Sequence, residues 1–406
     1  VLVEMKRALQ RSTLDAPGVA FTTGSEGTQV ALTRPARLVP ANGGVLTISQ
    51  GRGGAYQAEP GAIGGGALNL VATRGRGLPE AQVAIPDWRL TDKGFEARIE
   101  ATAALDFDLA RGLKVRTQGL LANADGRLTY VTPDCVDLSI ERLELDENDV
   151  TDVAGVLCPT SAPLLTSQNG AWRVESVFRG LSAHAPFLGL RFDEAEGALT
   201  ATGGDAGLGL EARVGDAQVI DEIEPRRFNT LSASGAAALR DERWSGGFDL
   251  ARAGARIGAL TLAHDGRAGV GGVTIGAPDL AFAEGGLQPS DLTPLVDGLV
   301  QSPVTGSVGF QGRIGWIEDG EGTSEGRLTV PGLDFASPAG AVHGLKGEVV
   351  FASLTPLVTA SNQRLTIDRL ETATDLTDLE VTFDLDAAAL NLGGASVRAA
   401  GGVVSL

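Results

Sequence analysis

Fifteen residues decide the fold class of this chain: FEARIEATAALDFDL, residues 95–109. Every odd position from Phe95 to Leu109 is apolar, whereas the even positions carry mainly Glu, Arg, Thr and Asp. Successive side chains of a β-strand point to opposite faces of the sheet, so an alternation of period two is typical of strands with one buried face. The stretch therefore predicts half-buried antiparallel strands whose other face is in water.

The same alternation returns at 113–116, 208–214 and 379–385. Asp-Gly pairs at 125–126 and 265–266 lie between such runs. An Asp-Gly pair in this position favours a hairpin, because Gly accepts the positive φ that a tight turn demands. We expect an all-β chain in which consecutive strands are mostly neighbours.

Helical signals are few. From Leu292 to Leu299 the apolar residues recur at i, i+3, i+4 and i+7, which predicts a short helix over 289–300. A second short helix is predicted over 4–10. Both would be accessories to a sheet.

Composition restricts the partners. The net charge of −18 argues against nucleic acid, since no basic stripe is present to displace phosphate counterions, and it does not suit direct docking on an anionic membrane surface. Charge, Gly or Pro interrupts the apolar stretches before they reach the roughly 18 to 20 residues of a membrane-spanning helix. Because the chain starts at Val1 without an initiator Met, we expect a membrane anchor in a missing N-terminal part.

The only two cysteines, Cys135 and Cys158, could close a loop as a disulfide in an oxidising compartment. That bond would place the chain outside the cytoplasm. Two free thiols are the main alternative. A zinc site would need further ligands near the cysteines, and the three histidines are not close to one another in sequence.

No catalytic constellation stands out. The Gly-rich stretch 61–66 precedes a strand-like run and not a helix N-terminus, so it does not indicate a phosphate-binding loop. No close pair of carboxylates lies in an apolar run where burial would separate their pKa values. We therefore expect a protein without catalytic residues, cofactor or metal, and not an enzyme.

Few residues of the predicted apolar face are large. Gly accounts for 56 of 406 residues, about twice the usual share, and only 5% of residues are aromatic. A closed sandwich or barrel needs large residues on its inner face, so closure here would leave the interior poorly packed. The sequence instead predicts a long, strongly curved antiparallel sheet that forms an open hydrophobic groove, taco-like or a partial barrel.

The residues expected to line this groove are the apolar members of the alternating runs. They are Phe95, Ile99, Leu105, Phe107, Leu109, Leu208, Leu210, Val214, Leu365, Ile367, Leu379, Val381, Phe383 and Leu385.

The C-terminal third resembles a known family. The segments LKGEVVF at 345–351, LTPL at 354–357, QRLTI at 363–367 and LTDLEVTF at 376–383 are similar to the C-terminal domain of the YdbH family of AsmA-like proteins of the Gram-negative envelope. The helix expected around 289–300 fits the same pattern. The resemblance covers roughly residues 280–385.

This resemblance implies a periplasmic protein, anchored to the inner membrane, whose β-groove carries phospholipid toward the outer membrane. It also implies two regions: an extended β-groove segment over 1–279, and a C-terminal β domain over 280–406 that is truncated at its end. Its partners would be phospholipid and unidentified proteins at the two membranes. A structural or adhesive β-rich envelope protein remains the alternative.

Overall fold

The structure, a computed structural model, describes residues 10–75, 78–107, 109–145, 149–205, 207–318, 320–386, 389–399 and 402–405. In these ranges the chain forms 29 strands and only short helical turns. The predicted all-β class is therefore confirmed. None of the helices in the described ranges is long and apolar enough to cross a membrane. The helix predicted over 4–10 lies outside the described residues, apart from Gln10.

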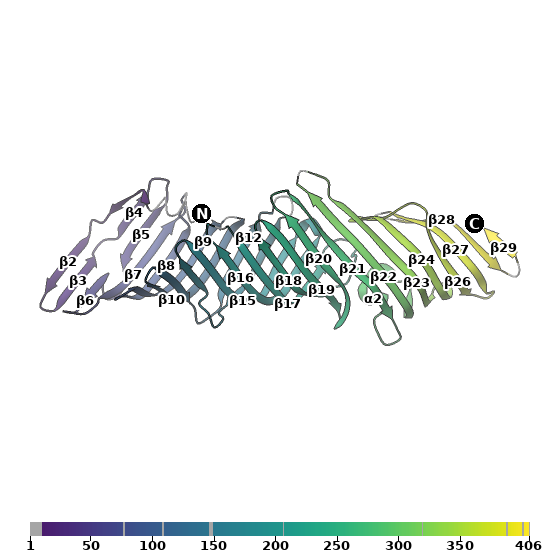
Figure 1. Cartoon of the computed structure of the whole chain (residues 1–406), viewed down its shortest axis with the longest axis horizontal. Coiled ribbons are helices and arrows are strands. Elements are labelled where there is room, and N and C mark those ends of the chain that lie inside the picture. Colours follow the sequence, from purple (N-terminus) through teal and green to yellow (C-terminus); the bar gives the residue numbers. More distant parts are fainter. Residues whose placement is uncertain are drawn as a thin grey trace. The chain divides into compact units, whose positions relative to one another are not determined.

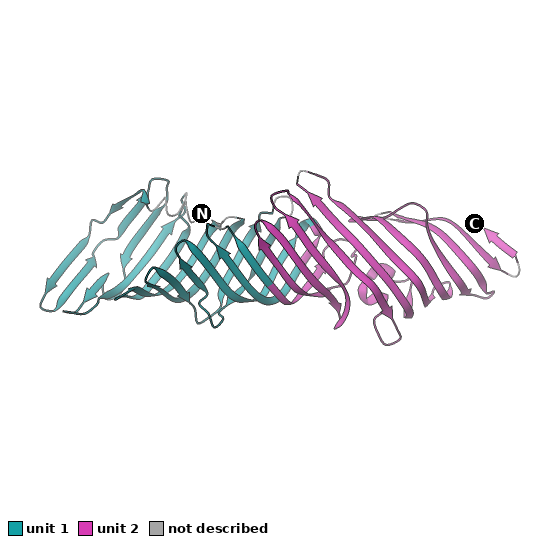
Figure 2. Ribbon diagram, in the orientation of Figure 1, with its two compact units in different colours: residues 1–187, 192–212 teal, residues 188–191, 213–406 magenta. Residues whose placement is uncertain are grey.

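The chain divides into two compact units, which Figure 2 colours separately. Unit 1 comprises residues 1–187 and 192–212, and unit 2 comprises residues 188–191 and 213–406. This division differs from the boundary at 279/280 that the family resemblance implied. Residue 280 lies inside an unbroken strand, β21 (Val270–Phe282), which is paired on both sides.

Unit 1 contains the first fifteen strands. Their bounds are β1 (Ser12–Asp15), β2 (Val19–Gly24), β3 (Gly27–Leu32), β4 (Ala36–Pro40), β5 (Val45–Gln50), β6 (Tyr56–Ala58), β7 (Gly65–Thr73), β8 (Glu80–Thr91), β9 (Gly94–Phe107), β10 (Ala110–Ala124), β11 (Arg127–Val131), β12 (Val136–Leu143), β13 (Val150–Cys158), β14 (Leu165–Gln168) and β15 (Ala171–Ala185). The elements that straddle the division between the units are η2 (Pro186–Leu188), β16 (Leu190–Gly203) and β17 (Gly209–Asp221).

The sheet of unit 1 is antiparallel throughout the ladders that join β1, β4, β5, β7, β8, β9 and β10 in that order. The strands from β7 to β10 run side by side in Figure 1. The hairpin from β10 to β11 turns at the Asp-Gly pair predicted from the sequence. Asp125 and Gly126 both have positive φ there, 52° and 78°, as a two-residue hairpin turn requires.

Strand β10 changes partners halfway along its length. Residues 110–116 pair with β12, and residues 120–124 pair with β11. Strand β15 likewise pairs with β14 over its first residues and with β13 over the rest of its length. A disulfide lies at the end of the β12–β13 ladder, joining Cys135, just before β12, to Cys158, the last residue of β13. The free thiols left open by the sequence are therefore absent.

Unit 2 continues as a meander. Its strands are β18 (Leu231–Arg240), β19 (Arg243–Arg252), β20 (Ala255–Asp265), β21, β22 (Gln301–Ile317), β23 (Thr323–Ser337), β24 (Gly340–Leu354), β25 (Leu357–Thr359), β26 (Gln363–Glu371), β27 (Leu376–Asp386), β28 (Ala389–Ala399) and β29 (Gly402–Ser405). Consecutive strands pair antiparallel, except that β26 pairs with β24 past the short β25. Among the described residues β29 pairs only with β28, and the sheet is not a closed barrel.

The helix predicted over 289–300 is replaced by two short turns, α2 (Pro289–Leu292) and η3 (Pro294–Val296). Thr293 separates them in an extended conformation, with φ −146° and ψ 135°. A residue that precedes proline is disfavoured in the helical region, so Pro294 ends the helix one turn after it begins. The segment still packs on the sheet, because Leu292 contacts a core cluster around the fully buried Val304.

A buried ion pair shows that the sheet of unit 2 is strongly curved. Asp221, at the end of β17, has a fully buried side chain that accepts a 2.6 Å bond from Arg227 Nη2. The same guanidinium donates to the Leu188 carbonyl at 2.9 Å and to Thr355 Oγ1 at 3.1 Å. Arg227 lies just before β18 and Thr355 just after β24, so the intervening strands must curl to bring these two connections together.

Candidate functional site

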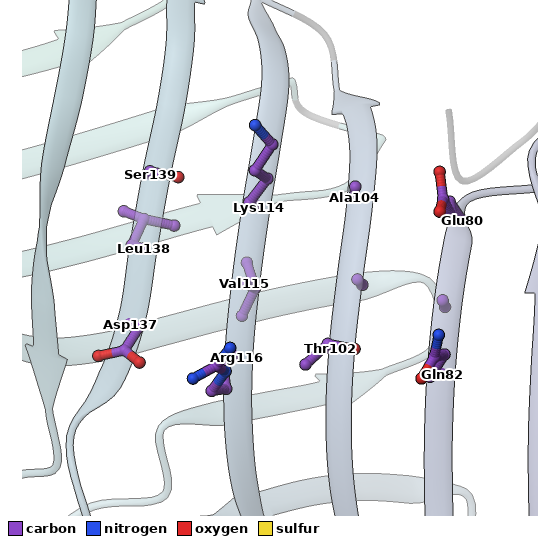
Figure 3. A pocket seen from close by; sticks show the side chains of 12 residues that line it. Glu80, Gln82, Thr102, Ala104, Lys114, Val115, Arg116, Asp137, Leu138 and Ser139 are labelled. Carbon is purple, nitrogen blue, oxygen red and sulfur yellow. The ribbon is translucent and has the colours of Figure 1, made fainter.

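One face of the sheet of unit 1 is apolar and can be followed from strand to strand by register. Ala103 on β9 lies opposite Val115 on β10, and Val115 lies opposite Leu138 on β12. Figure 3 shows Val115 and Leu138 behind the ribbon, whereas Lys114 and Arg116 project toward the viewer. The alternation in the sequence therefore separates a polar face from an apolar one, as a pleated strand requires.

The polar face of these strands carries an open hollow of about 450 Å³ (Figure 3). Its charged lining residues are Glu80, Lys114, Arg116 and Asp137, so acidic and basic groups balance. The hollow lies on the opposite face from the predicted groove residues, and its balanced charge favours neither anions nor cations.

Three predicted groove residues, Phe95, Ile99 and Leu105, are half-buried on one face of β9. Ile99 also packs against the buried cluster that contains Tyr130. The alternation was expected to extend to Leu109, but β9 ends at Phe107, which pairs with Ala110 across the turn into β10. Leu109 therefore lies in a turn and is 40% exposed. The side chain of Phe107 lies outside the described part of the structure.

The second predicted run falls on β17 and the residue before it. Leu210 and Val214 are half-buried and alternate with the exposed Glu211 and Arg213. Leu208 is half-buried but precedes the strand. This run has the alternation expected of a strand with one apolar face.

The third predicted group lies together in unit 2. Leu365 lies opposite Val381, and Ile367 lies opposite Leu379, so the four side chains form one patch on β26 and β27. Further along β27 the half-buried Phe383 and Leu385 lie opposite two exposed residues of β28, Leu392 and Leu390. The patch thus extends to the last long strand.

The apolar face of β20 to β22 was missed by the sequence reasoning. Leu262, Val273 and Ile314 lie opposite one another on these three strands and continue the apolar face. Glycines interrupt the alternation of the neighbouring positions and hide the pattern. One of them, Gly312, is tightly packed, because a Cβ there would lie 3.0 Å from the ring of Phe310.

On the opposite face of the sheet of unit 2, ion pairs join neighbouring strands. Examples are Arg364 with Glu380 at 3.3 Å, and Arg327 with Glu348. All four side chains are between 38% and 65% exposed, so each pair contributes little to stability. Because these charged side chains are exposed, this face of the sheet is in contact with water and differs in character from the apolar face.

The described residues contain little that resembles catalytic machinery. No group of three or more His, Cys, Asp or Glu in these ranges is placed to hold a metal ion. The string Gly-Thr-Ser-Glu-Gly at 322–326 matches the pattern of a hydrolase nucleophile, which sits on a turn between a strand and a helix. Here Ser324 lies within β23, and its Oγ is 3.2 Å from Ser353 Oγ and accepts a 3.0 Å bond from the Leu354 N–H.

Comparison with known proteins identifies the family. No curated protein and no solved structure matches the chain. One protein-family model, YdbH-like, described as the intermembrane phospholipid transport protein YdbH, matches residues 154–406. The match begins well before the C-terminal third that carried the resemblance in the sequence, and it covers more than half of the chain. The chain therefore belongs to the YdbH-like family.

Proposed function

We propose that this chain is a non-enzymatic carrier segment that conducts phospholipid acyl chains along its apolar sheet face between the inner and outer membranes. The single observation that carries the proposal is the apolar face itself, which passes from strand to strand in each unit with its side chains only half-buried. The family membership supports phospholipid as the cargo.

The physical basis is the transfer of acyl chains out of water. Each buried CH₂ contributes about 0.8 kcal/mol, so even a partly covered chain gains several kcal/mol on such a face. Binding of this kind is non-directional, which allows a lipid to move along the face without breaking specific bonds. A carrier needs that property, whereas an enzyme needs fixed polar groups.

We place this function in the periplasm, with the full-length protein anchored to the inner membrane. The family description supports an intermembrane location. The Cys135–Cys158 disulfide also fits an oxidising compartment.

The test places a carboxylate on the apolar face. Val381→Asp sets a charge between Leu365 and the half-buried Ala395, its neighbours on β26 and β28. We expect the amount of phospholipid that co-purifies, measured by mass spectrometry, and the transfer of fluorescent phospholipid between vesicles to fall at least tenfold. Desolvating the new carboxylate beneath an acyl chain is the cause.

The matched control is Thr382→Asp, one residue along the same strand. Thr382 lies on the polar face opposite Arg364, so a carboxylate there stays in water beside a cation. Transfer should be unchanged, and circular dichroism should show that both variants fold. A native chain that neither carries nor transfers phospholipid would refute the proposal and leave the structural or adhesive role.

A further inference from the structure

A row of ring side chains crosses the apolar face of unit 2 near one end of β19 to β22. Trp244 on β19 lies opposite His264 on β20. His264 in turn lies opposite Gly271 on β21, which lies opposite Trp316 on β22. Each of these four residues is the second from the end of its strand, so the row runs beside the turns at this edge of the sheet. We call Trp244, His264 and Trp316 the ring row.

The register places the ring row on the apolar face. Residues two positions apart on a strand point to the same face of the sheet. Two positions inward on β20, β21 and β22 lie Leu262, Val273 and Ile314, which therefore share the face of the row. All of these side chains are half-buried, whereas Ser245 and Thr261 on the other face are exposed. The ring row thus borders the surface that the proposed function assigns to acyl chains.

Gly271 allows the ring row to form across β21. A Cβ on Gly271 would lie 2.6 Å from the Trp316 ring, so the missing side chain leaves room for the indole. The indole reaches over β21 toward His264, and the centroids of the two rings are 6.0 Å apart. Trp316 Nε1–H donates to His264 Nδ1 at 3.1 Å. Because Nδ1 accepts this bond, the neutral imidazole carries its proton on Nε2.

The ring row leaves two N–H donors for a ligand. In the described part of the chain neither Trp244 Nε1 nor His264 Nε2 has a hydrogen-bond partner, and neither atom is buried. A lipid that covered these N–H groups without accepting from them would remove their bonds to water, which costs free energy. A ligand that brings acceptor oxygens to this edge of the apolar face avoids that cost. Both donors are neutral, so they select for an oxygen acceptor and not for a charge.

The apolar face is covered at the opposite ends of these strands. Phe282, the last residue of β21, and Val304 of β22 are buried there, and Leu292 of α2 packs against their cluster. A lipid on this stretch therefore meets polar partners at the ring row and only apolar side chains toward the α2 end. Trp and His rings suit such a boundary, because the body of the ring contacts hydrocarbon while its N–H contacts polar groups.

We propose that the ring row binds the acceptor oxygens at the polar end of a phospholipid, the glycerol ester and phosphate oxygens, while the acyl chains run inward along β19 to β22. The inference rests on the proposed function and adds an orientation and a polar contact to it. Phe248 marks the path of the chains, because it lies on the same face of β19, four residues inward of Trp244. At a rise of about 3.3 Å per residue, the two positions are about 13 Å apart.

The first test measures the orientation of bound lipid by nitroxide quenching of tryptophan fluorescence. Replacing Trp88 and Trp172 by Phe in the full chain leaves Trp244 and Trp316 as the emitting residues. The chain is loaded from vesicles of phosphatidylcholine that carries the nitroxide either on the head group or at the end of one acyl chain. The vesicles are then removed by gel filtration, and bound lipid is quantified by mass spectrometry. Per bound lipid, the head-group label should quench more strongly than the chain-end label.

The reference variant moves the reporter inward along β19. It carries Phe248→Trp in a chain whose four natural tryptophans are replaced by Phe, and here the chain-end label should quench more strongly. A chain-end label that quenches Trp244 and Trp316 at least as strongly as the head-group label overturns the inference and leaves the proposed function in place. A loaded chain in which neither label quenches has the same consequence. If neither labelled lipid is loaded, the proposed function itself fails.

The second test removes one donor and keeps an aromatic ring. Trp244→Phe should weaken the binding of dihexanoylphosphatidylcholine about fivefold, as expected for the loss of one neutral hydrogen bond. Binding is measured by isothermal titration calorimetry below the micelle concentration of the lipid. The matched control is Ser245→Ala, the next residue along β19 on the opposite face, which should leave the affinity unchanged. An affinity that Trp244→Phe leaves unchanged, with the thermal midpoint also unchanged, overturns the polar contact.

Discussion

Replacing Asp221 by Ala should destabilise unit 2 while leaving unit 1 unchanged. The carboxylate accepts bonds from the backbone N–H and the Nε and Nη2 groups of Arg227, and from the Ile223 N–H. Its removal leaves the guanidinium of Arg227, whose side chain is only 18% exposed, without its counter-ion. Breaking a buried ion pair on one side costs about 3–5 kcal/mol. We expect about 3 kcal/mol, because Arg227 keeps its bonds to Leu188 and Thr355.

The assay uses the distribution of the four tryptophans. Trp88 and Trp172 lie in unit 1, whereas Trp244 and Trp316 lie in unit 2. Replacing the first pair by Phe in both the native and the variant background leaves a fluorescence signal that reports on unit 2 during urea unfolding. Replacing Trp244 and Trp316 by Phe instead leaves a fluorescence signal that reports on unit 1.

The control removes an exposed partner, Asp249, which pairs with Arg256 at 2.7 Å while the two side chains are 59% and 65% exposed. Asp249→Ala should cost less than about 1 kcal/mol. The double change Asp221→Leu with Arg227→Met should recover most of the loss, because an apolar pair leaves no stranded charge. Equal losses for Asp221→Ala and Asp249→Ala would refute the role of the buried pair.

The same pair predicts a pH dependence. Burial opposes ionisation of Asp221, but the bonds from Arg227 outweigh it and hold the pKa of Asp221 below its usual range. A depressed pKa contributes stability above the unfolded-state value of about 3.9, and this contribution is lost as the pH falls through the folded-state value. The stability difference between the native chain and Asp221→Ala should therefore narrow below about pH 4. A difference that stays constant from pH 7 to pH 3 would contradict this.

Two further predictions concern packing and covalent structure. Val304→Ala should lower the free energy of unfolding of unit 2 by about 2–3 kcal/mol, because Val304 is 0% exposed and two buried carbons are lost. Its control is Val403→Ala, which should change this free energy little, because Val403 is 66% exposed. Cys158→Ser should destabilise unit 1 by about 3 kcal/mol in urea unfolding, since the bond to Cys135 closes a loop with a sequence separation of 23. A native chain that unfolds at the same urea concentration with and without reductant would contradict the second expectation.

The alternation of polar and apolar faces was readable from the sequence because strand periodicity is local, whereas the lipid contacts of the groove residues stay a prediction. An alternation such as Phe95 to Leu105 depends only on the geometry of successive residues, so both faces follow from sequence alone. The row through Leu262, Val273 and Ile314 was not recognised, because glycines occupy neighbouring apolar positions. Some of these glycines face rings on another strand, such as Gly271, where a Cβ would lie 2.6 Å from the Trp316 ring on β22, and no local sequence pattern reports that contact.

The sequence by itself determined the all-β class, the polar and apolar faces, the Asp125-Gly126 turn and the pair of cysteines able to bond. Only the tertiary structure decided how β10 divides between β11 and β12, where the units separate, and how strongly the sheet of unit 2 curves. That curvature is visible in the bond between Arg227 and Thr355, 128 residues apart. The difference is physical: a strand's faces are set by its own backbone, whereas pairing and curvature are set by packing between residues that only the folded chain brings together.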